Sequence, residues 1–148
     1  MTTHTTTQDS GQGQLADCTV NVRVKISALW AAMLFIFAYV DLFALYRPDF
    51  RADLAEDKIS VFTVNEAFLL FATGYITVAS LMVFLTVVLR PRIARMSNMI
   101  ISVLYVLTIV PSAIGEWYYF ILGSILEVGL LGMIFYYAWS WPKQAAQA

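Results

Sequence analysis

Four long apolar stretches, separated by short polar segments, dominate the pattern of the chain. They cover residues 26–46, 63–89, 96–115 and 117–141. Each is long enough for a helix to cross a hydrocarbon core about 30 Å thick, which takes about 20 residues. None shows the alternation of polar and apolar positions that is typical of a membrane β-strand. The pattern therefore predicts an all-α, polytopic membrane protein with four transmembrane helices in an antiparallel bundle.

The residues between the stretches indicate where the helices begin and end. Pro48, Pro91 and Pro142 follow the ends of predicted helices, where a missing N–H costs little. The segment Thr63-Val64-Asn65-Glu66 has the spacing of a capping box, which predicts the start of the second helix near Thr63. Pro111 lies inside the third stretch and should kink that helix or end it early.

The two ends of the chain are polar. Residues 1–24 are too polar to bury a core and predict a disordered tail, and residues 143–148 form a second, short tail. The transmembrane domain is therefore expected at 25–142. Cys18 follows Leu-Ala-Asp as in a lipidation box, but no apolar segment precedes it. The first stretch is longer than the apolar part of a signal peptide, so we expect it to stay in the protein.

Composition removes several classes of protein. Of 148 residues, 60% are hydrophobic and 13% are charged, against about 25% charged in a soluble domain. The single Cys and the single His exclude an internal disulfide and argue against a zinc site, a haem site or paired-thiol chemistry. We expect no metal, no cofactor and no catalytic residues, and hence not an enzyme. A net charge of −1 without a basic stretch argues against nucleic acid as a partner.

The basic residues predict the orientation in the membrane, because Lys and Arg accumulate on the cytoplasmic side. One side would carry Arg23, Lys25, Arg90, Arg92, Arg95 and Lys143. The other side would carry Arg47, Arg51 and Lys58, offset by acidic neighbours. The excess favours a plasma (inner) membrane protein with both termini in the cytoplasm.

Polar residues recur at helical spacing within three of the stretches. In a bilayer such residues turn toward other helices, so we expect a polar bundle interior. Its predicted members are Thr73, Thr77, Ser80, Asn98, Ser102, Tyr105 and Ser124. Ordinary packing, with hydroxyls bonded to the previous turn or across helices, explains such stripes more simply than a conducting pathway.

The acidic residues are the candidates for chemistry. Glu127 lies about 15 Å along a helix from Trp117, at about 1.5 Å per residue, which is near the bilayer midplane. No Lys or Arg occurs within any stretch, so we expect a protonated Glu127 bonded to Tyr, Ser or Thr. Either it binds a proton or cation, with Asp41 or Glu66 beside the membrane surface, or it is a neutral acid that ties helices together.

The other acids have simpler explanations. The capping box accounts for Glu66, Asp41 could reach Arg47 or water, and Glu116 is expected to be a solvated loop residue.

Several segments are similar to a known family. They are Tyr39-Val40-Asp41, 85–90, 95–100 and 118–141, with Arg95 and Asn98 at the start of the third span and an aromatic fourth span. That fourth span carries Ser-Ile-Leu-Glu (124–127) and ends Tyr-Ala-Trp-Ser-Trp. Over roughly 25–142, outside the polar tail and the acidic segment 49–58, the chain resembles a bacterial family of small four-span membrane proteins of unknown function. The resemblance implies the four-helix fold and no particular activity.

Two functions remain open. The first expectation is a non-catalytic, membrane-organising protein that associates through its helices with a second copy or another membrane protein. The alternative is a small proton- or cation-linked transporter or channel that uses Glu127. A carrier needs Glu127 to reach water from one side, whereas an interaction protein needs it buried and hydrogen-bonded. In both cases the lipid bilayer is the surrounding partner.

Overall fold

The computed structural model describes residues 20–59 and 62–141, and the two predicted tails lie mostly outside these residues. The described part contains four long helices, a short helix and a two-stranded hairpin. These elements are α1 (Val22–Ala44), α2 (Pro48–Ala55), β1 (Lys58–Ile59), β2 (Phe62–Thr63), α3 (Glu66–Val88), α4 (Pro91–Ser112) and α5 (Tyr118–Trp139). α1, α3, α4 and α5 are each long and apolar enough to cross a membrane. The predicted fold class is confirmed.

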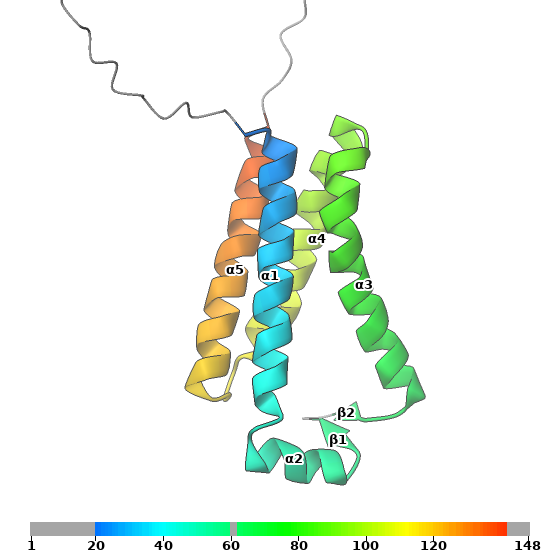
Figure 1. Ribbon diagram of the computed structural model, residues 1–148, viewed down its shortest axis with the longest axis vertical. Helices are drawn as coiled ribbons and strands as arrows, with labels where there is room; N and C mark the ends of the chain where they lie inside the picture. The colour runs from blue at the N-terminus through cyan, green and yellow to red at the C-terminus, as the bar shows by residue number, and fades with distance from the viewer. Residues whose placement is uncertain (1–19, 60–61, 142–148) are drawn as a thin grey trace, which may run out of the picture.

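The four long helices run alternately up and down (Figure 1). α1 packs against both α5 and α3, and α5 packs also against α4, whereas α3 and α4 touch much less. We call the end of the bundle where α1 begins and α5 ends the terminal end. The opposite end, which carries α2 and the β1–β2 hairpin, is the α2 end. Three helices therefore form a close group, with α3 attached mainly through α1.

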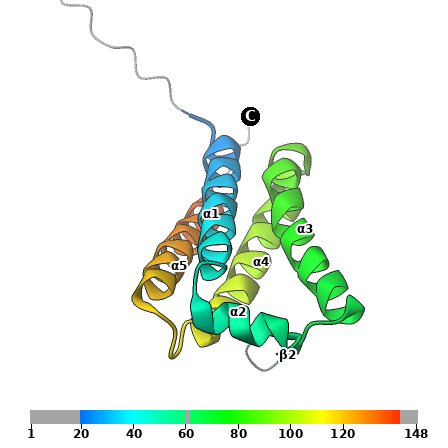
Figure 2. The same ribbon diagram turned by 60° about the horizontal axis from the view of Figure 1, so that its bottom comes forward.

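α3 leaves the bundle toward the α2 end (Figures 1 and 2). Its buried residues are Ala79, Met82 and Thr86, and no residue of α3 before Ala79 is buried. α2 and the antiparallel hairpin, in which Lys58 pairs with Thr63, connect the end of α1 to the start of α3. The buried residues of α3 thus lie in its half nearest the terminal end.

The apolar core is concentrated between α1 and α5. Ile26, Trp30 and Met33 of α1 and Leu131, Ile134 and Ala138 of α5 are almost completely buried. In lipid, such contacts stabilise the fold by close packing, since the tails of the lipids are as apolar as the side chains. At Gly123 a Cβ atom would clash with Val40. Glycine is therefore required for α1 and α5 to approach this closely.

At the terminal end of the bundle, two arginines donate hydrogen bonds to carbonyl groups in the last turns of other helices. Arg23 of α1 donates from Nη1 to the carbonyl of Val87 at 2.7 Å. Arg95 of α4 donates from Nη2 to the carbonyl of Trp139 at 3.2 Å. Both carbonyls lie in the last turn of a helix, where they lack intrahelical partners and where positive charge is favoured. Each arginine therefore fastens the start of one helix to the end of another.

Two predicted helix starts need correction. α1 begins at Val22 rather than 26, because Asn21 accepts a hydrogen bond from the Arg23 N–H at 3.0 Å. α3 begins at Glu66, capped by Asn65, whose side chain accepts from the Phe68 N–H at 2.8 Å. The capping-box prediction is wrong, since Thr63 belongs to the hairpin.

α4 begins and ends earlier than its predicted span. It starts at Pro91 and ends at Ser112, one residue after Pro111. Proline fits the first helical turn, because an N–H group at that position would have no partner within the helix. Pro111 therefore lies in the last turn and shortens the helix, one of the two outcomes the sequence predicts.

Candidate functional site

Glu127 lies on the buried face of α5, between Gly123 and Leu131. Its side chain is shielded by the helices around it, and the residue is only 3% exposed. Within the part of the chain that the structure describes, it makes no side-chain hydrogen bond and no ion pair. The expected bond to a Tyr, Ser or Thr is absent from these residues. An acid in this position keeps both carboxyl oxygens available for a proton, a water molecule or a cation.

Asp41 lies one turn before the end of α1. Its neighbour Val40 is buried against Gly123 of α5, whereas Asp41 itself is exposed. Asp41 and Glu127 are close enough for their charges to interact. The close approach of α1 and α5 thus places an accessible acid beside a buried one.

Tyr75 joins α3 and α4 to this pair of acids. Its hydroxyl is hydrogen-bonded to Thr108 Oγ1 at 2.7 Å, and it lies within electrostatic range of both Asp41 and Glu127. Its ring stacks on Tyr105 with centroids 4.4 Å apart, and the Tyr105 hydroxyl donates to the Tyr75 carbonyl. We call Asp41, Tyr75, Thr108 and Glu127 the acid cluster; it draws one residue from each long helix.

A second buried polar centre lies nearer the terminal end, around Asn98 of α4. Asn98 Oδ1 accepts from Trp30 Nε1 at 2.7 Å and from Thr86 Oγ1 at 3.1 Å. Its Nδ2 donates to the Ala94 carbonyl at 2.8 Å. We call Asn98, Trp30 and Thr86 the asparagine cluster. It ties α1, α3 and α4 together with its polar atoms in hydrogen bonds, as a structural centre requires.

The structure divides the predicted polar interior into two groups. Asn98, Ser102, Tyr105 and Ser124 are buried, whereas Thr73, Thr77 and Ser80 are exposed on the described chain. The interior placement of these three is wrong. α3 packs through Ala79, Met82 and Thr86, which lie on its opposite face by helical spacing. Equal spacing marks a shared face, but it does not say which way that face turns.

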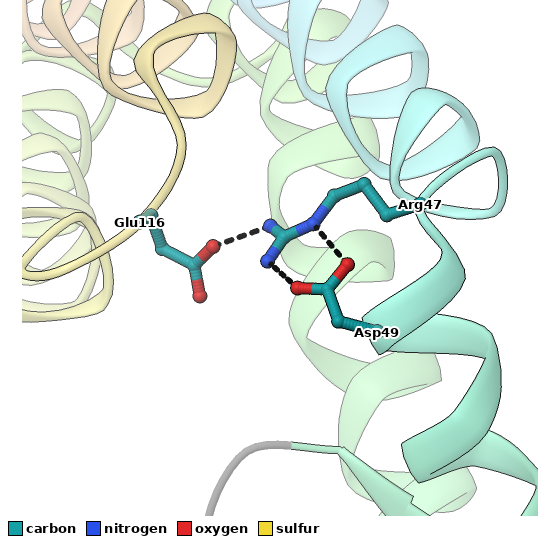
Figure 3. A network of polar contacts seen from close by, with 3 residues as sticks. All are labelled: Arg47, Asp49 and Glu116. Atoms are coloured by element: carbon teal, nitrogen blue, oxygen red, sulfur yellow. Dashed lines mark hydrogen bonds and ion pairs between the residues drawn. The ribbon is translucent and has the colours of Figure 1, made fainter.

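The remaining acids also differ from expectation. Glu66 is exposed at the diverging end of α3, and the structure does not bring it to Glu127. Arg47 binds Glu116 and Asp49 rather than Asp41 (Figure 3). Glu116 is therefore not a free loop residue: its Oε2 lies 2.5 Å from Arg47 Nη1.

The arginine cluster, consisting of Arg47, Asp49 and Glu116, fastens the α2 end of the close group. Arg47 Nη2 lies 2.6 Å from Asp49 Oδ2, and its guanidinium carbon lies 4.7 Å from the ring centroid of Trp117. The hydrogen bond from Arg47 lowers the pKa of Asp49, and the same bond raises the pKa of Arg47. One feature of the sequence could have predicted this cluster. Asp49 directly follows Arg47 and Pro48 and lies in the first turn of a helix, where a negative charge is favoured.

Four apolar helices, a polar centre between them and arginines at both ends define a polytopic α-helical membrane protein. The chain belongs to a family whose model is described as a family of unknown function (DUF6326) and matches residues 16–148. The resemblance to a family of small membrane proteins without known function is confirmed. The match also covers the acidic segment 49–58 and the C-terminal tail, which the resemblance left out. No curated protein and no solved structure matches the chain.

Proposed function

We propose that the protein is a proton- or cation-linked membrane transporter or channel in which Glu127 is the binding group. The observation that carries this proposal is the carboxyl group of a residue that is only 3% exposed and that has no hydrogen-bond partner among the described residues. An ionisable group inside a membrane is costly, by about 2.5–3.5 kcal/mol on insertion scales. A structural role would offset that cost with hydrogen bonds, as the asparagine cluster does.

Asp41 would be the first group that a proton or cation meets on its way to Glu127. It is exposed at the α2 end and interacts electrostatically with Glu127, so a proton or cation arriving from that side meets Asp41 first. Toward the terminal end, Met33, Leu131 and Ile134 are almost completely buried. This arrangement supports access to Glu127 from the α2 side. Release to the other side would then require α3, the least tightly held helix, to move.

The orientation follows from charge. Arg23, Lys25, Arg90, Arg92 and Arg95 lie at the terminal end, which favours that end in the cytoplasm of a plasma-membrane protein. Asp41 would then face the outside. We also propose that the protein is not an enzyme, since the chain carries only one His and one Cys.

Proton flux into liposomes tests this function. We expect purified wild-type protein to carry protons down an imposed gradient, and Glu127→Gln to lower the rate about tenfold or more, since Gln cannot exchange a proton. Asp41→Asn should slow the flux less. Glu56→Gln, which changes an exposed acid on the α2–β1 turn, is the matched control and should behave as wild type. Equal flux in wild type and Glu127→Gln would refute the proposal, provided that both proteins melt cooperatively.

The exposed polar face of α3 supports a second function, association with a second copy. Thr73, Thr77 and Ser80 share this face, and hydroxyls that face lipid gain from a helix partner. In a Cys18→Ser background, which removes the only native cysteine, Thr77→Cys should form disulfide-linked dimers in membranes. Ile100→Cys, exposed on α4, is the control. Absence of dimers with Thr77→Cys, or equal dimers with both, would exclude this interface.

A further inference from the structure

Two tyrosines and a threonine join α3 to α4 near the middle of the two helices. The Tyr105 hydroxyl donates to the Tyr75 carbonyl, and the Tyr75 hydroxyl is hydrogen-bonded to Thr108 Oγ1. We call Tyr75, Tyr105 and Thr108 the α3–α4 latch. In the described chain, no hydrogen bond from α3 to another long helix lies closer to the α2 end. The latch therefore restrains the half of α3 that leaves the bundle (Figure 1).

The hydrogens of these three hydroxyl groups are already assigned to acceptors. Thr108 Oγ1 donates to the Tyr105 carbonyl of its own helix at 2.9 Å. Because a hydroxyl has a single hydrogen to donate, Tyr75 must be the donor in its bond to Thr108. Tyr105 donates its own hydrogen to the Tyr75 carbonyl. The bond between Tyr75 and Thr108 thus depends on where the one hydrogen of the Tyr75 hydroxyl points.

A carboxylate nearby can compete for that hydrogen. Asp41 and Glu127 both lie within electrostatic range of Tyr75. Glu127 accepts no hydrogen bond in the described chain, yet its oxygens are not completely shut off from solvent, and the bond between Tyr75 and Thr108 is itself exposed. A hydrogen bond to an ionised carboxylate is roughly twice as strong as one to a neutral oxygen. An ionised Glu127 therefore competes with Thr108, whereas a protonated Glu127 does not.

The groups that face Tyr75 contain no positive charge that could satisfy the carboxylate instead. α1 contributes Asp41, α4 contributes Tyr105, and α5 contributes Glu127. Every Lys and Arg of the described residues lies at the start of a long helix or outside the long helices. An ionised acid between the helices must then be stabilised by hydroxyl groups or water. The Tyr75 hydroxyl is such a group.

We propose that protonation of Glu127 controls the α3–α4 latch, with Tyr75 as the positioning residue. While Glu127 is protonated, Tyr75 donates to Thr108 and α3 stays against α4. When Glu127 loses its proton to water, Tyr75 donates to the carboxylate, directly or through one water molecule. The latch then loses one of its two hydrogen bonds between the helices, and α3 moves away from α4. This inference rests on the proposed function, to which it adds the movement that proton release causes.

The distance between spin labels on α3 and α4 tests the latch in purified protein without any measurement of transport. In a Cys18→Ser background, Phe71→Cys and Leu107→Cys carry the labels at exposed positions. As the pH is raised from 5 to 9, we expect the distribution of distances to gain a longer component. The control pair is Phe84→Cys and Ile100→Cys, exposed in the halves nearest the terminal end, and its distance should stay constant. No change in the first pair, or the same change in both pairs, would overturn the proposal.

Four substitutions separate the latch from a merely structural contact. Glu127→Gln offers only a neutral acceptor and should keep the shorter distance at every pH. Tyr75→Phe preserves the stacked ring but removes the hydroxyl, so the longer component should be present already at pH 5. Thr108→Val should behave in the same way, whereas Thr108→Ser keeps the hydroxyl and should respond as wild type does. A pH response that survives in Glu127→Gln or in Tyr75→Phe would refute the latch.

The same measurements distinguish a failure of the latch from a failure of the proposed function. Proton flux that depends on Glu127, without any change in the distance, would refute the latch alone. A distance that depends on Glu127, without proton flux, would support the latch and refute transport. Asp41→Asn should keep the pH response, because the exposed Asp41 can accept hydrogen bonds from water. Loss of the response in Asp41→Asn would overturn the assignment of control to Glu127.

Discussion

Asn98 and Glu127 are both buried polar side chains on the inward faces of long helices, but their surroundings differ. Asn98 lies among a tryptophan, a threonine and a backbone carbonyl that all bond to it. Glu127 has no such partner among the described residues, and another acid lies nearby. The difference separates a polar group that holds helices together from one that is kept at a cost to stability. Such a cost is typical of a functional group.

The largest expected effect comes from breaking the asparagine cluster. Asn98→Leu keeps the size of the side chain but leaves Trp30 Nε1 without an acceptor, which should lower the free energy of unfolding by about 2 kcal/mol. Thermal melting in detergent would measure the loss. Ser97→Ala, one position along the same helix, is the control and should melt close to wild type. If Asn98→Leu melts like that control, the cluster is not a structural centre.

The acid cluster should respond in the opposite way. Glu127→Gln removes no hydrogen bond within the described chain and relieves the interaction with Asp41, so its stability should equal or exceed that of wild type by up to about 1 kcal/mol. Melting curves from pH 5 to 9 would show this. A loss of several degrees at every pH would mean that Glu127 is a structural acid after all. The contrast between the two centres would then disappear.

The smallest effect is expected at the surface, in the arginine cluster. The pKa of Asp49 is lowered by Arg47, so the ionised form of Asp49 contributes stability above the ordinary pKa of an aspartate, about 4. That contribution is lost as the pH falls through the lowered pKa. Asp49→Asn should therefore melt slightly below wild type at pH 7, and the difference should shrink as the pH falls below the ordinary pKa of an aspartate. Asp53→Asn on the same short helix is the control, and a difference that grows toward low pH would contradict this linkage.

The positions of the long helices could be predicted because each depends on a continuous run of apolar residues. α3 and α5 lie within a few residues of their predicted ranges. The starts of the helices were harder to predict. Asn21 and Asn65 cap α1 and α3, but other polar residues nearby could have done the same. α2 and the hairpin were missed, since such short elements are held by contacts with each other and are too short to show a periodic pattern.

The sequence by itself determined the class of the protein, the number of its long helices and the presence of an acid at mid-membrane depth. These properties follow from composition and spacing along one chain, because the length and the polarity of a segment decide whether it can cross a bilayer. Only the tertiary structure decided which side chains meet. Rotation of α3 turned Thr73 and Thr77 outward, and the close approach at Gly123 brought Asp41 to Glu127. Helix rotation and pairing depend on packing between distant segments, and spacing within one segment carries no information about that packing.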